Sequence, residues 1–392
     1  MKSLSKVLGV FFGLIVFPYF VLFGINISAF IFVVFVYTAA KNKKLNSYNS
    51  LVKIFLILII VGLYSSSLVN FELDSIFFKS VNYVYWVLLV HIIIMLRYYM
   101  NLVGLLKHVL PFFVMLIFYS YTRELIPKNL FFTHYISSNT VSFLFVCFTT
   151  PVFIYLRVYK QNVKLSYFVL GLVLFSLLLG GRRAGFVLVL MSAFFALNLN
   201  SINIRSVLKF CLASLLLILA LNLNFVSSSI ESKSARIHSL IYSSEEIIDD
   251  RSYQTRLAMI EKGLIIFDEN KIFGVGIGNF TNINVRFTNR FSNTDIVTNK
   301  SSINDTSAHN SYIQFLAELG LIAFLPFICL LLFNILTFTF YSKSLNNMQK
   351  SFYWSFFACL IHLYFISALF NIYAWALIAI VTSQSILIRQ KQ

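Results

Sequence analysis

Two adjacent arginines interrupt one of the most apolar stretches of this sequence. Arg182 and Arg183 lie in "LLLGGRRAGFVLVL", between two runs that are apolar enough to be membrane spans. A guanidinium at membrane depth costs about 2.5–3.5 kcal/mol on insertion scales, but its planar, always charged fork matches the oxygens of a phosphate. We interpret the pair as an anion site. Arginines that reach up to lipid headgroup phosphates are the alternative.

A histidine opens another apolar run, "HNSYIQFLAELGLIAF". His309 is followed by Asn310 and titrates near neutrality, which suits a general base at the water boundary. Glu318 lies roughly 13 Å further along a helix, so we do not expect it to pair directly with His309. A helix cap with an interfacial acid is the alternative interpretation of this motif.

A glycine motif, "GVGIGNF", precedes the histidine run and contains Gly276, Gly278 and Asn279. Spaced glycines can form a tight turn whose amides face a phosphate, but no strand and helix flank this motif as in a dinucleotide fingerprint. We therefore expect these residues, with Asn310 and Glu318, to support a site and not to define one.

The segment before the glycine motif has helical periodicity. In "RSYQTRLAMIEKGLIIFDENK", four apolar residues recur at helical spacing: Leu257, Ile260, Leu264 and Phe267. We predict an amphipathic helix that lies against the helical bundle or the membrane surface with these residues as its apolar face.

The elements that position these motifs are membrane helices. The chain is 59% hydrophobic and 11% charged over 392 residues, and apolar runs near the roughly 20 residues needed to cross a bilayer recur along it. We predict an all-α integral membrane protein of about twelve spans. The spans are 5–21, 23–40, 51–69, 80–97, 102–121, 138–156, 165–181, 184–200, 207–226, 311–340, 352–369 and 371–388.

The basic residues orient these spans. With a cytoplasmic N-terminus, the inside segments are rich in Lys and Arg and hold no Asp or Glu, so the positive-inside rule accounts for the net charge of +17. We predict no nucleic-acid partner, both termini in the cytoplasm, and a long outside loop. The chain then divides into helices 1–9 (1–226), the loop with its amphipathic helix (227–308), and helices 10–12 (309–392).

Together these pieces resemble the family of bacterial O-antigen polymerases and O-antigen ligases. The topology matches over the whole chain, and the matching motifs are "GGRRAG", "TRLAMIEKGLIIFDENKIFGVGIGNF" and "HNSYIQFLAELGLIAF". The resemblance implies a GT-C-like membrane glycosyltransferase. It also implies a bacterial inner-membrane location with the long loop and the active site in the periplasm.

The resemblance also implies roles for individual residues. Arg256, in "QTRLAM", occupies the place of the arginine thought to bind pyrophosphate in similar enzymes. Arg182 or Arg183 corresponds to the arginine of the middle motif. His309 corresponds to the catalytic histidine of the H-N motif.

The implied activity is transfer of a glycan from a polyprenyl-pyrophosphate-linked oligosaccharide, without metal or cofactor. Between two forms of this chemistry we favour a polymerase, which joins lipid-linked repeat units. An O-antigen ligase acting on lipid A core is the alternative, and a flippase or exporter of lipid-linked oligosaccharide is a further one. Membrane lipid and a chain-length regulator protein are the other expected partners.

Overall fold

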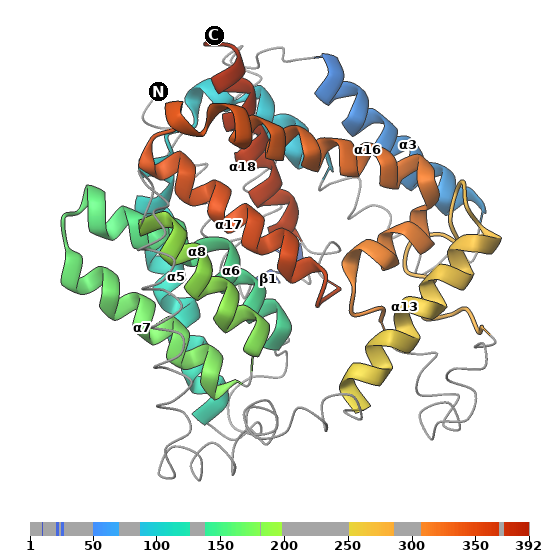
Figure 1. Cartoon of the computed structure of the whole chain (residues 1–392), viewed down its shortest axis with the longest axis horizontal. Coiled ribbons are helices and arrows are strands. Elements are labelled where there is room, and N and C mark those ends of the chain that lie inside the picture. Colours follow the sequence, from blue (N-terminus) through green and yellow to red (C-terminus); the bar gives the residue numbers. More distant parts are fainter. Residues whose placement is uncertain are drawn as a thin grey trace. The chain divides into compact units, whose positions relative to one another are not determined.

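The protein is almost entirely helical in the part of the chain that its computed structural model describes (Figure 1). That part consists of residues 10, 21–22, 25–26, 50–69, 87–125, 138–180, 182–197, 251–285, 307–367 and 372–391. One exception is an antiparallel pair of two-residue strands, β1 (Val21–Leu22) and β2 (Ile25–Asn26). This pair lies at the junction of the first two predicted spans, and the all-α fold class stands.

Apart from α13 and the short turns η1 and η3, the described helices overlap predicted spans. They are α3 (Ser50–Val69), a helix over 87–95, η1 (Arg97–Tyr99), α5 (Leu102–Leu125), α6 (Ser138–Ile154) with the π-helical turn η2 (Tyr155–Tyr159), α7 (Val163–Leu179), α8 (Arg183–Leu197), α13 (Arg251–Glu269), α16 (Ser311–Tyr341), η3 (Ser342–Ser344), α17 (Asn347–Leu363) and α18 (Ile372–Arg389).

Several of these helices have the composition of membrane spans. Among the described residues, three stretches are long and apolar enough to cross a bilayer: Leu102–Thr122, Asn139–Tyr159 and Ser311–Ser344. Shorter apolar helices cover Val52–Val61, Val163–Leu179, Ala184–Leu197 and Tyr373–Arg389. The chain is thus an α-helical membrane protein. Twelve spans and the outside loop stay predictions. Span 207–226 lies outside the described residues, and spans 5–21 and 23–40 are described only at residues 10, 21 and 25–26.

The chain forms two compact units, each built from separated segments. The first comprises Met1–Asn42, Tyr99–Ile247 and Leu345–His362, and the second comprises Lys43–Tyr98, Ile248–Ser344 and Leu363–Gln392. The predicted basic motif lies in the first unit, and the predicted amphipathic helix and histidine motif lie in the second.

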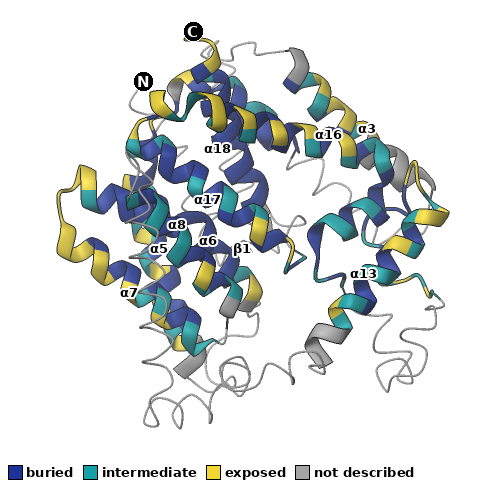
Figure 2. Ribbon diagram, in the orientation of Figure 1, coloured by how far each residue is buried: buried dark blue, intermediate teal, exposed yellow. Residues whose placement is uncertain are grey.

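In the first unit, α6 contacts α5, α7 and α8 and is buried along nearly its whole length (Figure 2). Small residues let α8 approach it closely, since a Cβ on Gly185 would collide with Ser142 of α6. The hydroxyl groups of Thr150 on α6 and Ser192 on α8 are hydrogen-bonded at 2.6 Å. Small residues and hydroxyl groups of this kind hold helices together in lipid, where the hydrophobic effect cannot.

In the second unit, α16 is the helix that the others contact. It packs against α3, α13 and α18. The side chain of Asn334 on α16 donates to the Thr382 hydroxyl at 2.9 Å and accepts from Ser385 at 2.7 Å, which fixes α18. The candidate site lies at the other, N-terminal end of α16.

Candidate active site

The amphipathic helix predicted in the long loop is present as α13, and it packs against α16. The residues of its predicted apolar face are exposed or only half-buried, and they are Leu257, Ile260, Leu264 and Phe267. The fully buried face of α13 holds both small and large residues, namely Ala258, Met259, Lys262 and Ile266. At Gly263 the approach is close, since a Cβ there would collide with the Ile313 side chain of α16.

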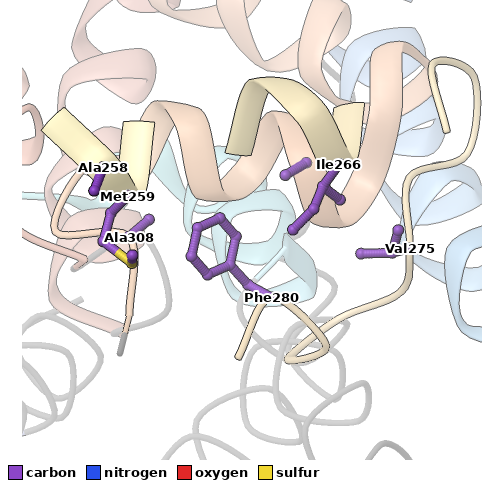
Figure 3. Packing of buried hydrophobic residues seen from close by; sticks show 7 residues of the cluster. Ala258, Met259, Ile266, Val275, Phe280 and Ala308 are labelled. Carbon is purple, nitrogen blue, oxygen red and sulfur yellow. The ribbon is translucent and has the colours of Figure 1, made fainter. Parts of the chain in front are cut away.

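The buried face of α13 belongs to a small apolar cluster (Figure 3). Its members are Ala258, Met259, Ile266, Val275, Phe280, Ala308 and Ala317. Figure 3 shows Ala308 beside Ala258 and Met259. Since Ala308 directly precedes His309 and Ala258 is two residues after Arg256, this packing brings two predicted site residues into one neighbourhood.

His309 and Asn310 form a tight start to α16. His309 is half-buried and has a left-handed backbone, with φ 50°. The Asn310 Oδ1 atom accepts the N–H groups of Tyr312 and Ile313 at 3.0 and 3.2 Å, so Asn310 caps the helix. A left-handed conformation costs a non-glycine residue about 1–2 kcal/mol, and such strain persists only where the surroundings hold it.

Arg256 acts electrostatically on His309. Burial lowers the pKa of His309 from its ordinary value of 6.5, and the positive charge of Arg256 lowers this pKa further. The Arg256 side chain is exposed on α13. A histidine with a lowered pKa is neutral at pH 7 and can accept a proton. This end of α16 therefore combines a neutral base with an accessible guanidinium.

The helix α16 is interrupted at Gly320, whose backbone angles of φ 62° and ψ −170° are not helical. The interruption leaves backbone groups of residues 317–322 without helical partners, and residues 271–276 supply them. The N–H groups of Val275 and Gly276 donate to carbonyls before the break at 3.1 and 2.9 Å. The carbonyls of Lys271 and Ile272 accept the N–H groups of Leu321 and Ile322, which lie after the break, at 2.9 and 3.2 Å.

The Glu318 side chain occupies the turn formed by the glycine motif. Its buried carboxylate accepts N–H groups from Gly278 (2.8 Å), Phe280 (3.4 Å) and the Gln314 amide (3.0 Å). The N–H of Gly278 therefore faces this carboxylate, and the N–H of Gly276 donates to the backbone carbonyl of Glu318. The anion that accepts the N–H groups of this turn is thus the Glu318 carboxylate of the protein itself.

Asn279 has a structural position in the same loop. Its side-chain amide donates to the Val275 carbonyl at 2.9 Å, and its Oδ1 atom accepts from Asn282 at 3.3 Å. The residue is buried. Asn279 therefore holds the turn closed.

Lys262 is a buried residue of this region that the sequence analysis missed. A lone lysine on an amphipathic helix normally faces water, but Lys262 is fully buried, with its Nζ atom 5.1 Å from the centre of the Phe280 ring. Its spacing in the sequence indicates this burial, because Lys262 is three residues after Met259 and four before Ile266, and all three therefore lie on the same face of the helix. Its cation–π contact joins α13 to the glycine loop.

Arg182 lies in the first unit, at the turn between α7 and α8. The residue is buried, and its Nη1 atom lies 3.4 Å from the Ser120 hydroxyl of α5, to which it donates. Arg183 begins α8, and its side chain lies outside the described residues. The convergence of Arg182 or Arg183 with Arg256 stays a prediction.

Metal ligands are not gathered in the described part of the chain: no three His, Cys, Asp or Glu side chains lie together there. The buried Glu318 carboxylate instead accepts N–H donors.

Comparison with known proteins bears on the residues just described. A family model described as O-antigen ligase matches residues 167–328, a region that holds the basic motif, α13, the glycine loop and the first half of α16. Among curated proteins no match is found. The resemblance noted from the motifs is confirmed, because residues 167–328 of this chain match the model of the O-antigen ligase family.

Proposed function

We propose that this protein polymerises a surface polysaccharide of the O-antigen or capsule type. It transfers a polyprenyl-pyrophosphate-linked glycan to a hydroxyl group of another lipid-linked repeat unit. The family match supports polymerase or ligase chemistry. The observation that carries the proposal is the electrostatic proximity of Arg256 to the neutral, half-buried His309, because transfer from a lipid pyrophosphate needs a base and a cation that binds the leaving group.

In the proposed reaction His309 takes the proton of the acceptor hydroxyl as its oxygen attacks the anomeric carbon of the donor sugar. The bond from that carbon to the pyrophosphate oxygen breaks, and polyprenyl pyrophosphate departs with the electron pair. Arg256, together with Arg182 or Arg183, stabilises its negative charge. A single displacement of this kind inverts the anomeric configuration and needs no metal.

We place this reaction at the periplasmic face of the bacterial inner membrane. The placement rests on the distribution of Lys and Arg between the predicted spans. Lipid-linked donors carry their pyrophosphate at headgroup level, which is where arginines between two spans lie. A chain-length regulator protein is the expected partner of a polymerase.

One observation favours a second candidate function. The matching family model is described as O-antigen ligase, so transfer of the finished glycan to lipid A core uses the same proposed residues with another acceptor. The acceptor alone separates the two activities.

The test uses the purified protein in lipid nanodiscs with a polyprenyl-pyrophosphate-linked repeat unit and EDTA. A ladder of products spaced by one repeat supports the polymerase. Product that forms only when lipid A core is added supports the ligase, and dependence on added Mg²⁺ contradicts the metal-free mechanism. His309→Ala should abolish product, whereas Lys271→Ala, at an exposed salt bridge to Asp268, should not. If neither acceptor gives product, the protein reconstituted in vesicles is tested for transport of the lipid-linked donor.

A further inference from the structure

The Arg182 side chain is held by neighbouring groups in the first unit. Its backbone N–H donates to the Leu177 carbonyl at 2.9 Å, which anchors the residue to the end of α7. Its Nη1 atom donates to the Ser120 hydroxyl, and this hydroxyl is in turn hydrogen-bonded to that of Ser176 on α7. The guanidinium is thus joined to two helices through a pair of hydroxyl groups.

Gly180 completes this arrangement. A Cβ at Gly180 would lie 2.8 Å from both Cζ and Nε of Arg182, which is closer than real side chains come. The backbone of Gly180 (φ −82°, ψ 2°) is one that alanine adopts without strain. Glycine is therefore needed here for space: the guanidinium lies against its bare backbone.

We infer that Gly180, Ser120 and Ser176 are positioning residues that set the plane of the Arg182 guanidinium for the pyrophosphate of the lipid-linked donor. The inference rests on the proposed function and deepens it. Bidentate contact with phosphate oxygens depends on the orientation of the planar fork, and a long arginine side chain loses rotamer entropy when it is fixed. A side chain that is already fixed loses less when the anion binds.

The test is Gly180→Ala, which keeps every charge and displaces only the far end of a flexible side chain. The matched control is Gly171→Ala on the same helix, where an added Cβ meets nothing within 4 Å. Two quantities are measured for each variant: kcat and KM with the lipid-linked donor, and the Kd for inorganic pyrophosphate by calorimetry. Ser120→Ala is measured in the same way.

Gly180→Ala should lower kcat/KM by about 10- to 100-fold, the size of effect expected from misplacing a group by about 1 Å, and should weaken pyrophosphate binding. Gly171→Ala should match the wild type. In an Arg182→Ala background Gly180→Ala should cause no further loss, because the group that it displaces is gone. A purely structural defect would add to the loss in that background, and this result would overturn the inference.

The measurement of pyrophosphate binding tests this inference separately from the proposed function. If the wild type makes no glycan product but binds pyrophosphate, and Gly180→Ala weakens that binding, the transferase proposal fails and the positioning role stands. If Arg182→Ala impairs both quantities while Gly180→Ala and Ser120→Ala leave both unchanged, Arg182 binds the anion and the positioning role is wrong.

Discussion

The Glu318 carboxylate and the backbone N–H of Gly278 form a hydrogen bond of 2.8 Å between α16 and the loop that follows α13. Amides in a glycine-rich turn form a concave site that favours an anion. In this protein the anion is a side chain of the neighbouring helix. The glycine motif therefore links α13, which carries Arg256, to α16, which begins directly after His309 and Asn310.

Replacing Glu318 with Gln should destabilise the protein. The Gln side chain has one acceptor oxygen and an N–H₂ group, which would face a backbone N–H, and a buried unsatisfied donor costs about 1–3 kcal/mol. The thermal unfolding midpoint in detergent should fall accordingly. Glu269→Gln, at an exposed position on α13, should leave the midpoint unchanged. Equal midpoints for the two variants would mean that the Glu318 bonds contribute nothing to stability.

The break in α16 should require glycine. A Cβ on Gly320 would collide with the Ile272 carbonyl, and one on Gly274 would collide with the Glu318 backbone. Both residues also have positive φ, 62° and 69°. Gly320→Ala should cost about 1–3 kcal/mol from its backbone conformation, with a further loss as the backbone bonds across the break are disturbed.

The thermal unfolding midpoint and the yield of folded protein check this prediction. Gly171→Ala is the control, because glycine in a helix interior is about 0.5–1 kcal/mol less favourable than alanine. That variant should be as stable as the wild type or more stable. A Gly320→Ala protein of wild-type stability would show that α16 is continuous in solution.

The charge of Arg256 should set the acid limb of the pH–rate profile. The pKa of His309 lies below 6.5 because of burial and because of Arg256, so His309 remains an unprotonated base to lower pH than an ordinary histidine. Arg256→Gln removes one cause, raises this pKa and should shift the acid limb of kcat/KM to higher pH, besides lowering the rate. Arg256→Lys keeps the charge and should leave the limb in place. An unshifted limb in Arg256→Gln would show that another group is the base.

The cap at the start of α16 should matter for both stability and activity. Asn310→Ala removes the acceptor for two N–H groups and should cost about 1 kcal/mol. Because His309 directly precedes the cap, kcat should fall as well. Asn310→Ser restores a capping oxygen and should recover most of both losses. Asn284→Ala, at an exposed position after the glycine loop, is the control. An Asn310→Ala variant that behaves like this control would show that the cap contributes to neither stability nor activity.

Sequence patterns predicted the helices well where the structure describes them. Apolar runs predicted α5, α6, α7, α8 and α16 because a helix satisfies its backbone hydrogen bonds locally and its length follows from the run. The helix α13 was predicted for the same reason. Its close approach to α16 was not, because periodicity counts large apolar residues, whereas this approach needs the space left by Gly263 beside the Ile313 side chain.

Composition and apolar run length were enough to predict a helical membrane protein, and the motifs indicated the family and the candidate residues Arg182, Arg256 and His309. The contacts of those motifs could be read only from the packed structure. The partner of Gly278 lies forty residues away on another helix, and the groups around Arg182 include Ser120, from a helix that the motif does not contain. Local patterns record backbone propensity and hydrophobicity, while such contacts depend on how separated helices pack, and a single sequence carries no direct record of that.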